Sequence, residues 1–541
     1  MLTHGTKGSD VYSTTGSKLL DLSVMLNRGL SNEVIRTYIR DIFTDGTLQD
    51  KIDTFVLAFQ TRDIRGGKGE RDLFYNMIVS LQKLSPQSVK AILPLIPEYG
   101  SWQDFLCFKT NNKLPDDIQQ LIFKQLDKDE ATPVGESISL LAKWLPREHS
   151  NIECDRKLAK DLSRCLYPND PKAQEKYRKR ITYLNKRLDT VEIRMCANKY
   201  SLIEPSKVPG RALKQYTKAF LNQPVKGLHG RKIIKQDLDR ITCAQNFRDH
   251  FALASKGNAK VNGANTVYPH EIIHSILNEI YPDIDALVSQ WHAIVKSVKD
   301  TGALSQTLAM CDFSGSMMGT PMDVSMALGL IIAECNTGIF ADHLLTFDAK
   351  PKLHKFESTN IINRVNEIRN LGQGLSTDFQ AAYNLILQKM KELRVSPGQE
   401  PKDLIVLTDM CWDEACIYKQ HSKYSGNTYN EAVKTKIEET HIQIARRAFK
   451  LAGEQLFGEG MGWKPPRIVI WNLRSENENF HAQTLEEGVV QVSGWSPSLL
   501  RVIITHGADK LTPEAMFRSQ LDDPRYDAVR TVVTPILTSV T

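Results

Sequence analysis

The chain has 541 residues, of which 41% are hydrophobic and 24% charged, so it is long enough for two to four domains with real cores, and its composition excludes a wholly disordered or collagen-like protein. No run of about eighteen apolar residues is present and residues 1–7 have no apolar signal segment, so we expect no transmembrane helix and no secretion. Nine scattered cysteines indicate reduced thiols, which predicts a cytoplasmic protein, or one of the virus factory or virion if the chain is viral.

Amphipathic segments at helical spacing follow one another between residues 31 and 148. They are separated by short turn signals, and the clearest of them span 72–81, 87–93, 116–126 and 138–144. The pattern predicts paired helices in a solenoid or bundle, although no tight repeat period is evident. The glycine-rich run 65–71 lacks the spacing of a phosphate-binding loop, so we interpret it as a tight basic turn between two helices.

Charge is segregated along the chain. The net charge of +6 is small, but residues 155–260 hold 25 Lys and Arg against 10 Asp and Glu, a local charge of +15 that leaves −9 for the rest. Segregation of this kind is what a nucleic-acid or phosphate surface requires, whereas the alternative is a solvated helical face paired with the acidic remainder.

The candidate RNA contacts lie in two cationic groups within this basic stretch, interleaved with aromatic residues such as Tyr177, Tyr183 and Tyr216. Lysine and arginine neutralise phosphates, while aromatic faces stack unpaired bases. The residues that we predict to bind nucleic acid are Lys176, Arg178, Lys179, Arg180, Lys186, Arg187, Lys207, Arg211, Lys214, Lys218, Arg231 and Lys232.

After residue 300, short apolar runs alternate with helical patterns. The expected strands are 307–311, 343–347, 404–408, 467–471 and 489–492, and the expected helices are 322–335, 379–393, 435–451 and 497–504. Near-continuous apolar strands between amphipathic helices predict a doubly wound parallel sheet covered on both faces. In such a sheet the ligand site lies where loops leave the carboxyl ends of the strands.

Oxygen-bearing side chains follow these strands. The first strand is followed by Asp312, Ser314 and Ser316, a later loop contains Thr377, and the third strand is followed by Asp409. Hydroxyls with a few carboxylates suit a hard cation that keeps some of its waters, so we predict that these five residues bind Mg²⁺. The alternative for each loop alone is a serine- and glycine-rich turn with a helix cap.

The pattern Asp312-x-Ser314-x-Ser316, with Thr377 and Asp409, resembles the metal-ion-dependent adhesion site (MIDAS) of von Willebrand factor type A domains. The resemblance implies a type A domain over residues 301–541, with one Mg²⁺ position open to a carboxylate from a protein partner. It also implies binding rather than catalysis.

The whole chain resembles a wider group of proteins. The run 61–71, the sequence Tyr-Pro-His-Glu at 268–271 and the type A pattern look like the Ro (TROVE-type) ribonucleoproteins, in which a ring of helical repeats precedes a type A domain. An uncharacterised family of plants, fungi and giant viruses is closer still, on the patterns at 142–148, 191–196 and 311–317. The resemblance implies an α plus α/β protein, with a HEAT-like helical-repeat region over 1–300.

Three functions compete at this stage. We predict a non-enzymatic, RNA-binding, ribonucleoprotein-like scaffold whose type A domain binds an acidic protein ligand through Mg²⁺. The alternative is a protein-assembly adaptor that uses the metal site alone, with the basic stretch serving internal packing. A Mg²⁺-dependent phosphohydrolase with Asp312 as nucleophile is less favoured, because no general acid or phosphate clamp is visible.

Overall fold

The computed structural model describes residues 2–4, 10–226, 232–256, 258–259, 268–279, 283–302, 304–347, 351–369, 371, 379–410, 441–474, 480–496 and 512–539. Contacts within the chain divide it into two compact units. The sheet unit comprises Met1–Ile42, Tyr268–Pro282 and Ile294–Asp522, and the helical unit comprises Phe43–Val267, Asp283–Ala293 and Asp523–Thr541. The predicted combination of an all-α and an α/β part is confirmed, whereas a domain boundary at residue 300 stays a prediction.

The main sheet of the sheet unit has six strands among the described residues, in the order β10-β9-β8-β5-β6-β7. Their bounds are β5 Thr307–Cys311, β6 His343–Thr346, β7 Leu353–Lys355, β8 Asp403–Thr408, β9 Arg467–Asn472 and β10 Val489–Ser493. All neighbours pair in parallel except β6 and β7, which are antiparallel. The five predicted strands are confirmed, and β7 is an additional edge strand.

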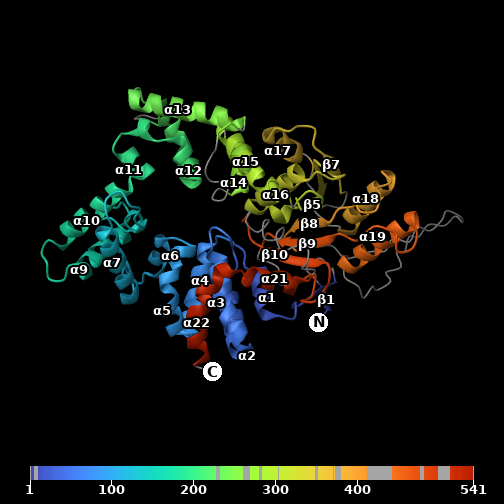
Figure 1. The fold of residues 1–541 in the computed structure, drawn as a ribbon, viewed down its shortest axis with the longest axis horizontal. Coiled ribbons are helices and arrows are strands. Elements are labelled where there is room, and N and C mark those ends of the chain that lie inside the picture. Colours follow the sequence, from blue (N-terminus) through green and yellow to red (C-terminus); the bar gives the residue numbers. More distant parts are fainter. Residues whose placement is uncertain are drawn as a thin grey trace. The chain divides into compact units, whose positions relative to one another are not determined.

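Helices cover both faces of this sheet (Figure 1). Leu308 and Met310 of β5 pack into one core with α18 (Phe379–Glu392) and α19 (His441–Phe457). Because side chains alternate along a strand, Cys311 faces the other side, where its thiol contacts the Ser325 carbonyl of α16 (Thr320–Cys335). The sheet is therefore doubly wound, as predicted. The predicted helix at 497–504 lies outside the described residues.

Segments from far along the chain complete the sheet unit. Helix α1 (Lys18–Met25) and helix α21 (Pro513–Leu521) contact β10, and α14 (Pro269–Asn278) packs against α16 and α17 (Ile361–Arg369). The end of α1 is joined to the sheet by buried hydrogen bonds: the Asn27 amide donates to the Asn472 carbonyl at 2.7 Å, and the Ser493 hydroxyl to the Ser23 carbonyl at 2.7 Å. The amino-terminal β1 (Leu2–His4) and β2 (Asp10–Tyr12) form a small hairpin.

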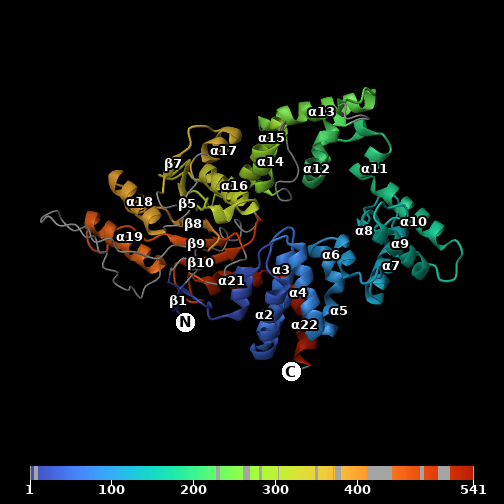
Figure 2. The ribbon, with the colours of Figure 1, turned by 180° about the vertical axis from the view of Figure 1, so that it is seen from behind.

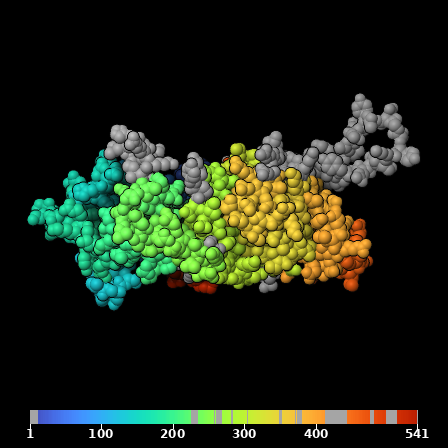
Figure 3. All heavy atoms as spheres, turned by 90° about the horizontal axis from the view of Figure 1, so that it is seen from above, coloured from blue at the N-terminus to red at the C-terminus, as the bar shows by residue number. Residues whose placement is uncertain are grey.

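The helical unit is built almost entirely of helices. Their bounds include α3 Leu48–Arg62, α4 Arg71–Leu84, α5 Pro86–Ile92, α6 Ile96–Tyr99, α7 Asp116–Ala131, α8 Leu141–Trp144, α9 Glu153–Leu166, α10 Ala173–Leu188, α11 Val191–Cys196, α12 Gly210–Phe220, α13 Leu238–Ser255 and α22 Asp527–Thr538; α2 (Asn32–Asp45) and α15 (Ile284–Lys299) extend into both units. Helix α22, from the end of the chain, packs against α3 and α5 (Figure 2), and α13 lies at the surface (Figure 3, green). A HEAT-like repeat stays a prediction.

One predicted helix is shorter than expected. The apolar pattern 138–144 yields only α8, which begins at Leu141. Upstream of it, the Ser139 amide and hydroxyl donate to the Asp129 carboxylate at 3.1 and 2.5 Å. Serine side chains that bond elsewhere compete with helix formation, so this anchor keeps residues 138–140 out of the helix. The predicted turn after α3 is confirmed, since residues 63–70 join α3 to α4.

Candidate metal centre

The candidate site lies where the direction of chain winding reverses in the sheet. From β5 the chain proceeds to β6 and β7 on one side, and later to β8, β9 and β10 on the other. Ligands of doubly wound sheets bind at the carboxyl ends of the two strands that flank this switch point. Those strands are β5 and β8, and Asp312 and Asp409 are the residues that follow them.

Asp312 is held by its neighbours on both strands. Its amide donates to the Leu407 carbonyl of β8 at 2.9 Å. Its carboxylate accepts the Ser314 amide at 2.9 Å and the Thr408 hydroxyl at 3.3 Å, and the residue is fully buried. A carboxylate fixed by donors on two sides is oriented before any ligand arrives, which lowers the cost of binding a cation.

The two serine hydroxyls of the loop converge. A single 3-10 turn, Gly315–Met317, brings the Ser314 and Ser316 hydroxyls into a hydrogen bond, with their oxygens 2.9 Å apart. Adjacent ligands of an octahedral Mg²⁺ with bonds of 2.0–2.1 Å lie about 2.9 Å apart, so this spacing fits two neighbouring positions of such a shell. Ser314 is buried, whereas Ser316 is exposed at the surface. The donor chemistry and the spacing both fit a hard divalent cation.

Asp409 and Thr377 complete the predicted set. Cys311 pairs with Leu407 in the parallel register of β5 and β8, so Asp312 and Thr408 are level and Asp409 follows one residue later. Asp409 is 2% exposed. Thr377 lies outside the described residues. The structure thus brings Asp312, Ser314 and Ser316 together and places Asp409 at the next strand end.

Within the described residues, ligands other than hydroxyls and carboxylates contribute little at this strand end. Among the described residues, no group of three or more His, Cys, Asp or Glu side chains is arranged to hold a metal. Burial raises the pKa of the neighbouring Cys311 thiol, which therefore stays protonated at neutral pH. A cation at this strand end would depend on hydroxyl oxygens as well as carboxylates.

Thr408 is a site residue that the sequence analysis missed. Its hydroxyl donates to Asp312 and accepts the Met410 amide at 3.1 Å, so it links the ends of β5 and β8. In the sequence, Thr408 is indistinguishable from an ordinary strand residue, because threonine is common in strands. Its position directly before Asp409 was the available signal.

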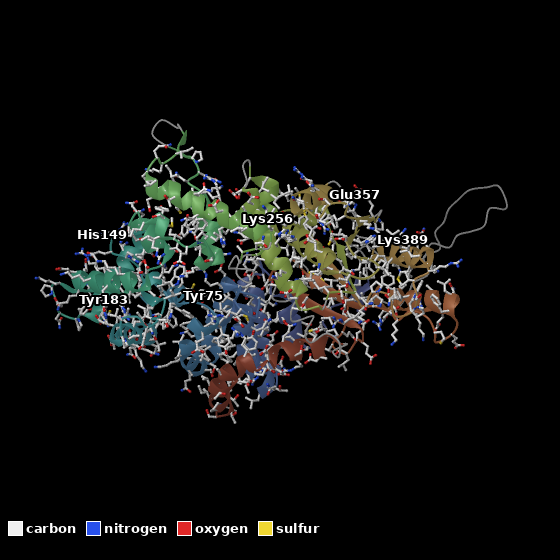
Figure 4. The ribbon with its side chains drawn as sticks, turned by 45° about the horizontal axis from the view of Figure 1, so that its top comes forward. Tyr75, His149, Tyr183, Lys256, Glu357 and Lys389 are labelled. Atoms are coloured by element: carbon white, nitrogen blue, oxygen red, sulfur yellow. The ribbon has the colours of Figure 1, made fainter. Side chains whose placement is uncertain are left out.

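The predicted RNA contacts on α10 are engaged with neighbouring groups. Lys176 pairs with Asp170, Arg178 with Glu148 at 3.6 Å, Lys179 with Glu175 at 2.7 Å, and Arg180 with Asp127 and Glu130 at 2.5 and 2.9 Å. Hydrogen bonding to Asp170 raises the pKa of Lys176. Arg187 donates to the carbonyls of Asp129 and Pro133, both at 2.9 Å. Lys186 and Tyr183 are exposed, and Tyr183 lies on the outer side of α10 (Figure 4).

The second cationic group is only partly described. Lys207 pairs with Glu204 at 2.8 Å, and Arg211, Lys214 and Lys218 lie on α12. Arg231 lies outside the described residues, and only the backbone of Lys232 is described, in the short strand β4 (Lys232–Ile233).

The fold and the strand-end arrangement define an α/β protein whose candidate ligand site presents carboxylates and hydroxyls. Comparison with known proteins shows which proteins the chain is similar to. The pattern of one domain of unknown function (DUF2828) matches residues 107–304, and that of another (DUF7788) matches residues 306–538. The chain is 30% identical over 538 residues to "Uncharacterized protein L728" of Acanthamoeba polyphaga mimivirus, covering 95% of this chain and 86% of the viral protein. The chain belongs to the family of that giant-virus protein.

This relationship agrees with the predicted resemblance to a family that includes giant viruses. Kinship with type A domains and with Ro ribonucleoproteins stays a prediction. Within the described residues, no helix is both long enough and apolar enough to cross a bilayer.

Proposed function

We propose that the sheet unit is a type A domain that binds Mg²⁺ and uses it to hold a carboxylate of a protein partner. The observation that supports this proposal is the loop after β5, where two donors fix Asp312 and the hydrogen-bonded Ser314 and Ser316 oxygens lie 2.9 Å apart, a distance that also suits adjacent octahedral positions. Asp409 and Thr377 would complete the shell, directly or through water. The cation would supply an electrophilic position for an incoming acidic side chain.

The first experiment measures the cation alone. Calorimetric titration of the full chain with Mg²⁺ is expected to show one saturable site, and Asp312→Asn is expected to weaken it by about 100-fold, the upper end of effects seen for groups around a metal. Asp300→Asn removes an exposed carboxylate elsewhere in the sheet unit and is the matched control. Equal Mg²⁺ affinity in wild type and Asp312→Asn would refute the site.

The second proposed activity is RNA binding by the helical unit. It is supported by the charge of +15 over residues 155–260 and by the exposed Lys186 and Tyr183 of α10. The Arg187 guanidinium lies 5.9 Å from the Tyr183 ring centre, so the two present a cation and an aromatic face together. Such pairs suit single-stranded RNA, in which phosphates and bases are both accessible.

Salt dependence separates the two activities. Fluorescence anisotropy with a labelled single-stranded RNA should show affinity that falls linearly with the logarithm of salt concentration, with a slope of about −0.7 for each phosphate neutralised. Replacing Lys179 and Lys186 by glutamine should make that slope shallower by one to two units, whereas Asp312→Asn should leave it unchanged. If RNA does not bind at low salt while a protein partner binds only with Mg²⁺, the protein-assembly adaptor is the favoured function.

A further inference from the structure

The residue after Asp409 has a backbone conformation that its side chain disfavours. Met410 has a φ of +71°, in the left-handed region that residues with a Cβ adopt rarely. Its side chain is only 4% exposed and packs in the core between the sheet and α18 and α19. The Met410 side chain fills space in the core although its backbone is strained. Such strain persists only where the surrounding structure enforces it.

Hydrogen bonds hold both the amide and the carbonyl of Met410. The Met410 amide donates to the Thr408 hydroxyl at 3.1 Å. The Met410 carbonyl accepts from His481, whose Nε2 lies 3.1 Å away. A carbonyl oxygen can only accept, so the His481 Nε2 carries the proton. The Thr408 bond closes a turn around Asp409, and the His481 bond fixes the carbonyl of the residue that follows it.

His481 is itself rigidly placed. It is 1% exposed, and the residues on either side of it are bonded to other elements. Phe480 exchanges two backbone hydrogen bonds with Tyr12 of β2, at 2.7 and 2.9 Å, and the Ala482 carbonyl accepts the Gln491 amide group of β10 at 2.9 Å. The His481 imidazole therefore joins a segment that is fixed by β2 and β10 to the residues that follow β8.

We propose that His481 is the positioning residue of the metal site, holding Met410 left-handed so that Asp409 faces the cation bound by Asp312. The proposal rests on the proposed Mg²⁺ site and adds a residue that the aspartate, serine and threonine pattern does not contain. Hydrogen bonds link His481 to the Met410 carbonyl and the Met410 amide to the Thr408 hydroxyl. The Thr408 hydroxyl in turn donates to Asp312. Loss of the imidazole donor would let Met410 relax to negative φ and turn Asp409 away.

The test is Mg²⁺ calorimetry on the full chain and three variants, with thermal unfolding measured in EDTA. His481→Leu removes the donor and is expected to weaken Mg²⁺ binding by about tenfold or more, as outer-shell partners of metal ligands do. His481→Gln keeps an N–H donor at a similar reach and should stay within about threefold of wild type. Met410→Val keeps an apolar side chain but opposes positive φ more strongly, so it should weaken Mg²⁺ binding by at least as much as His481→Leu.

The results separate a failure of the positioning role from a failure of the metal site. Unchanged Mg²⁺ affinity in His481→Leu and in Met410→Val would overturn the positioning role while leaving the metal site intact. Equal loss in His481→Gln and His481→Leu would also overturn it, because the donor would then be irrelevant. If wild type takes up no Mg²⁺, the proposed site itself fails. If His481→Leu does not fold in EDTA, Met410→Val and His481→Gln decide the question.

Discussion

Lys68 gives the helical unit a stability that depends on pH. The turn after α3 folds back on that helix, with the Lys68 amide donating to the Gln60 carbonyl at 3.0 Å and the Glu70 amide to the Thr61 carbonyl at 2.8 Å. The turn leaves Lys68 only 2% exposed. Burial lowers its pKa from 10.5 to about 7, with Glu70 opposing the shift.

The sign and size of the effect follow from that shift. Between pH 7 and 10.5 the unfolded chain holds a proton on Lys68 that the folded chain has lost, so the free energy of unfolding rises with pH. The slope is about 1.4 kcal/mol per pH unit, and the full difference over the window is about 5 kcal/mol. The stability is complete above pH 10.5 and is lost as the pH falls through about 7.

The measurement compares wild type with Lys68→Met in urea unfolding followed by circular dichroism at pH 7.5, 8.5 and 9.5. The difference in unfolding free energy between the two proteins should change by about 1.4 kcal/mol for each unit of pH. Lys83→Met, which removes an exposed lysine from α4, controls for the loss of one charge. A difference that stays constant across the three values would refute the assignment of a neutral buried Lys68.

Two further predictions concern the same turn. Asp63→Ala should lower the unfolding free energy of the helical unit by about 3 kcal/mol, because the fully buried carboxylate accepts the Arg525 guanidinium at 3.0 Å, and Asp527→Ala, an exposed neighbour, should change it by less than about 0.5 kcal/mol. Gly67→Ala should lower the melting temperature by several degrees, since a Cβ there would lie 1.9 Å from the Gln60 carbonyl oxygen. Melting temperatures equal to wild type would contradict either one.

The strands of the sheet were predictable because parallel strands buried on both faces are continuous apolar runs. Residues 307–311 are all buried, as are 468–472, and their sequence carries that signal directly. Strand β7 has only three residues, none of them fully buried, so its composition does not distinguish it from a loop. Edge strands with one open side lose the hydrophobic signal for this reason.

The partners of distant segments were not predictable. Seven of the eight residues of helix α1 are buried, and nothing in its sequence indicates that the element it packs on is β10. The same holds for His481, which lies 71 residues from Met410 and hydrogen-bonds to its carbonyl oxygen. Every residue has a backbone carbonyl, so the sequence does not indicate which one a histidine will bond to. The Asp312 loop was predictable because Asp312, Ser314 and Ser316 lie within five consecutive residues.

The net charge of residues 155–260 is larger than the number of cations whose side chains are exposed enough to meet a phosphate would suggest. Arg180 is counted in the charge of +15, yet its side chain is 9% exposed and bridges the carboxylates of Asp127 and Glu130, so little of its guanidinium is accessible to a phosphate. Lys179 and Lys207 also form ion pairs, but their side chains are 73% and 74% exposed. Exposed pairs contribute at most about 1 kcal/mol, so a phosphate can replace the carboxylate at little cost. Exposure rather than pairing therefore decides which predicted contacts stay available, and it favours Lys179, Lys186 and Lys207 over Arg180.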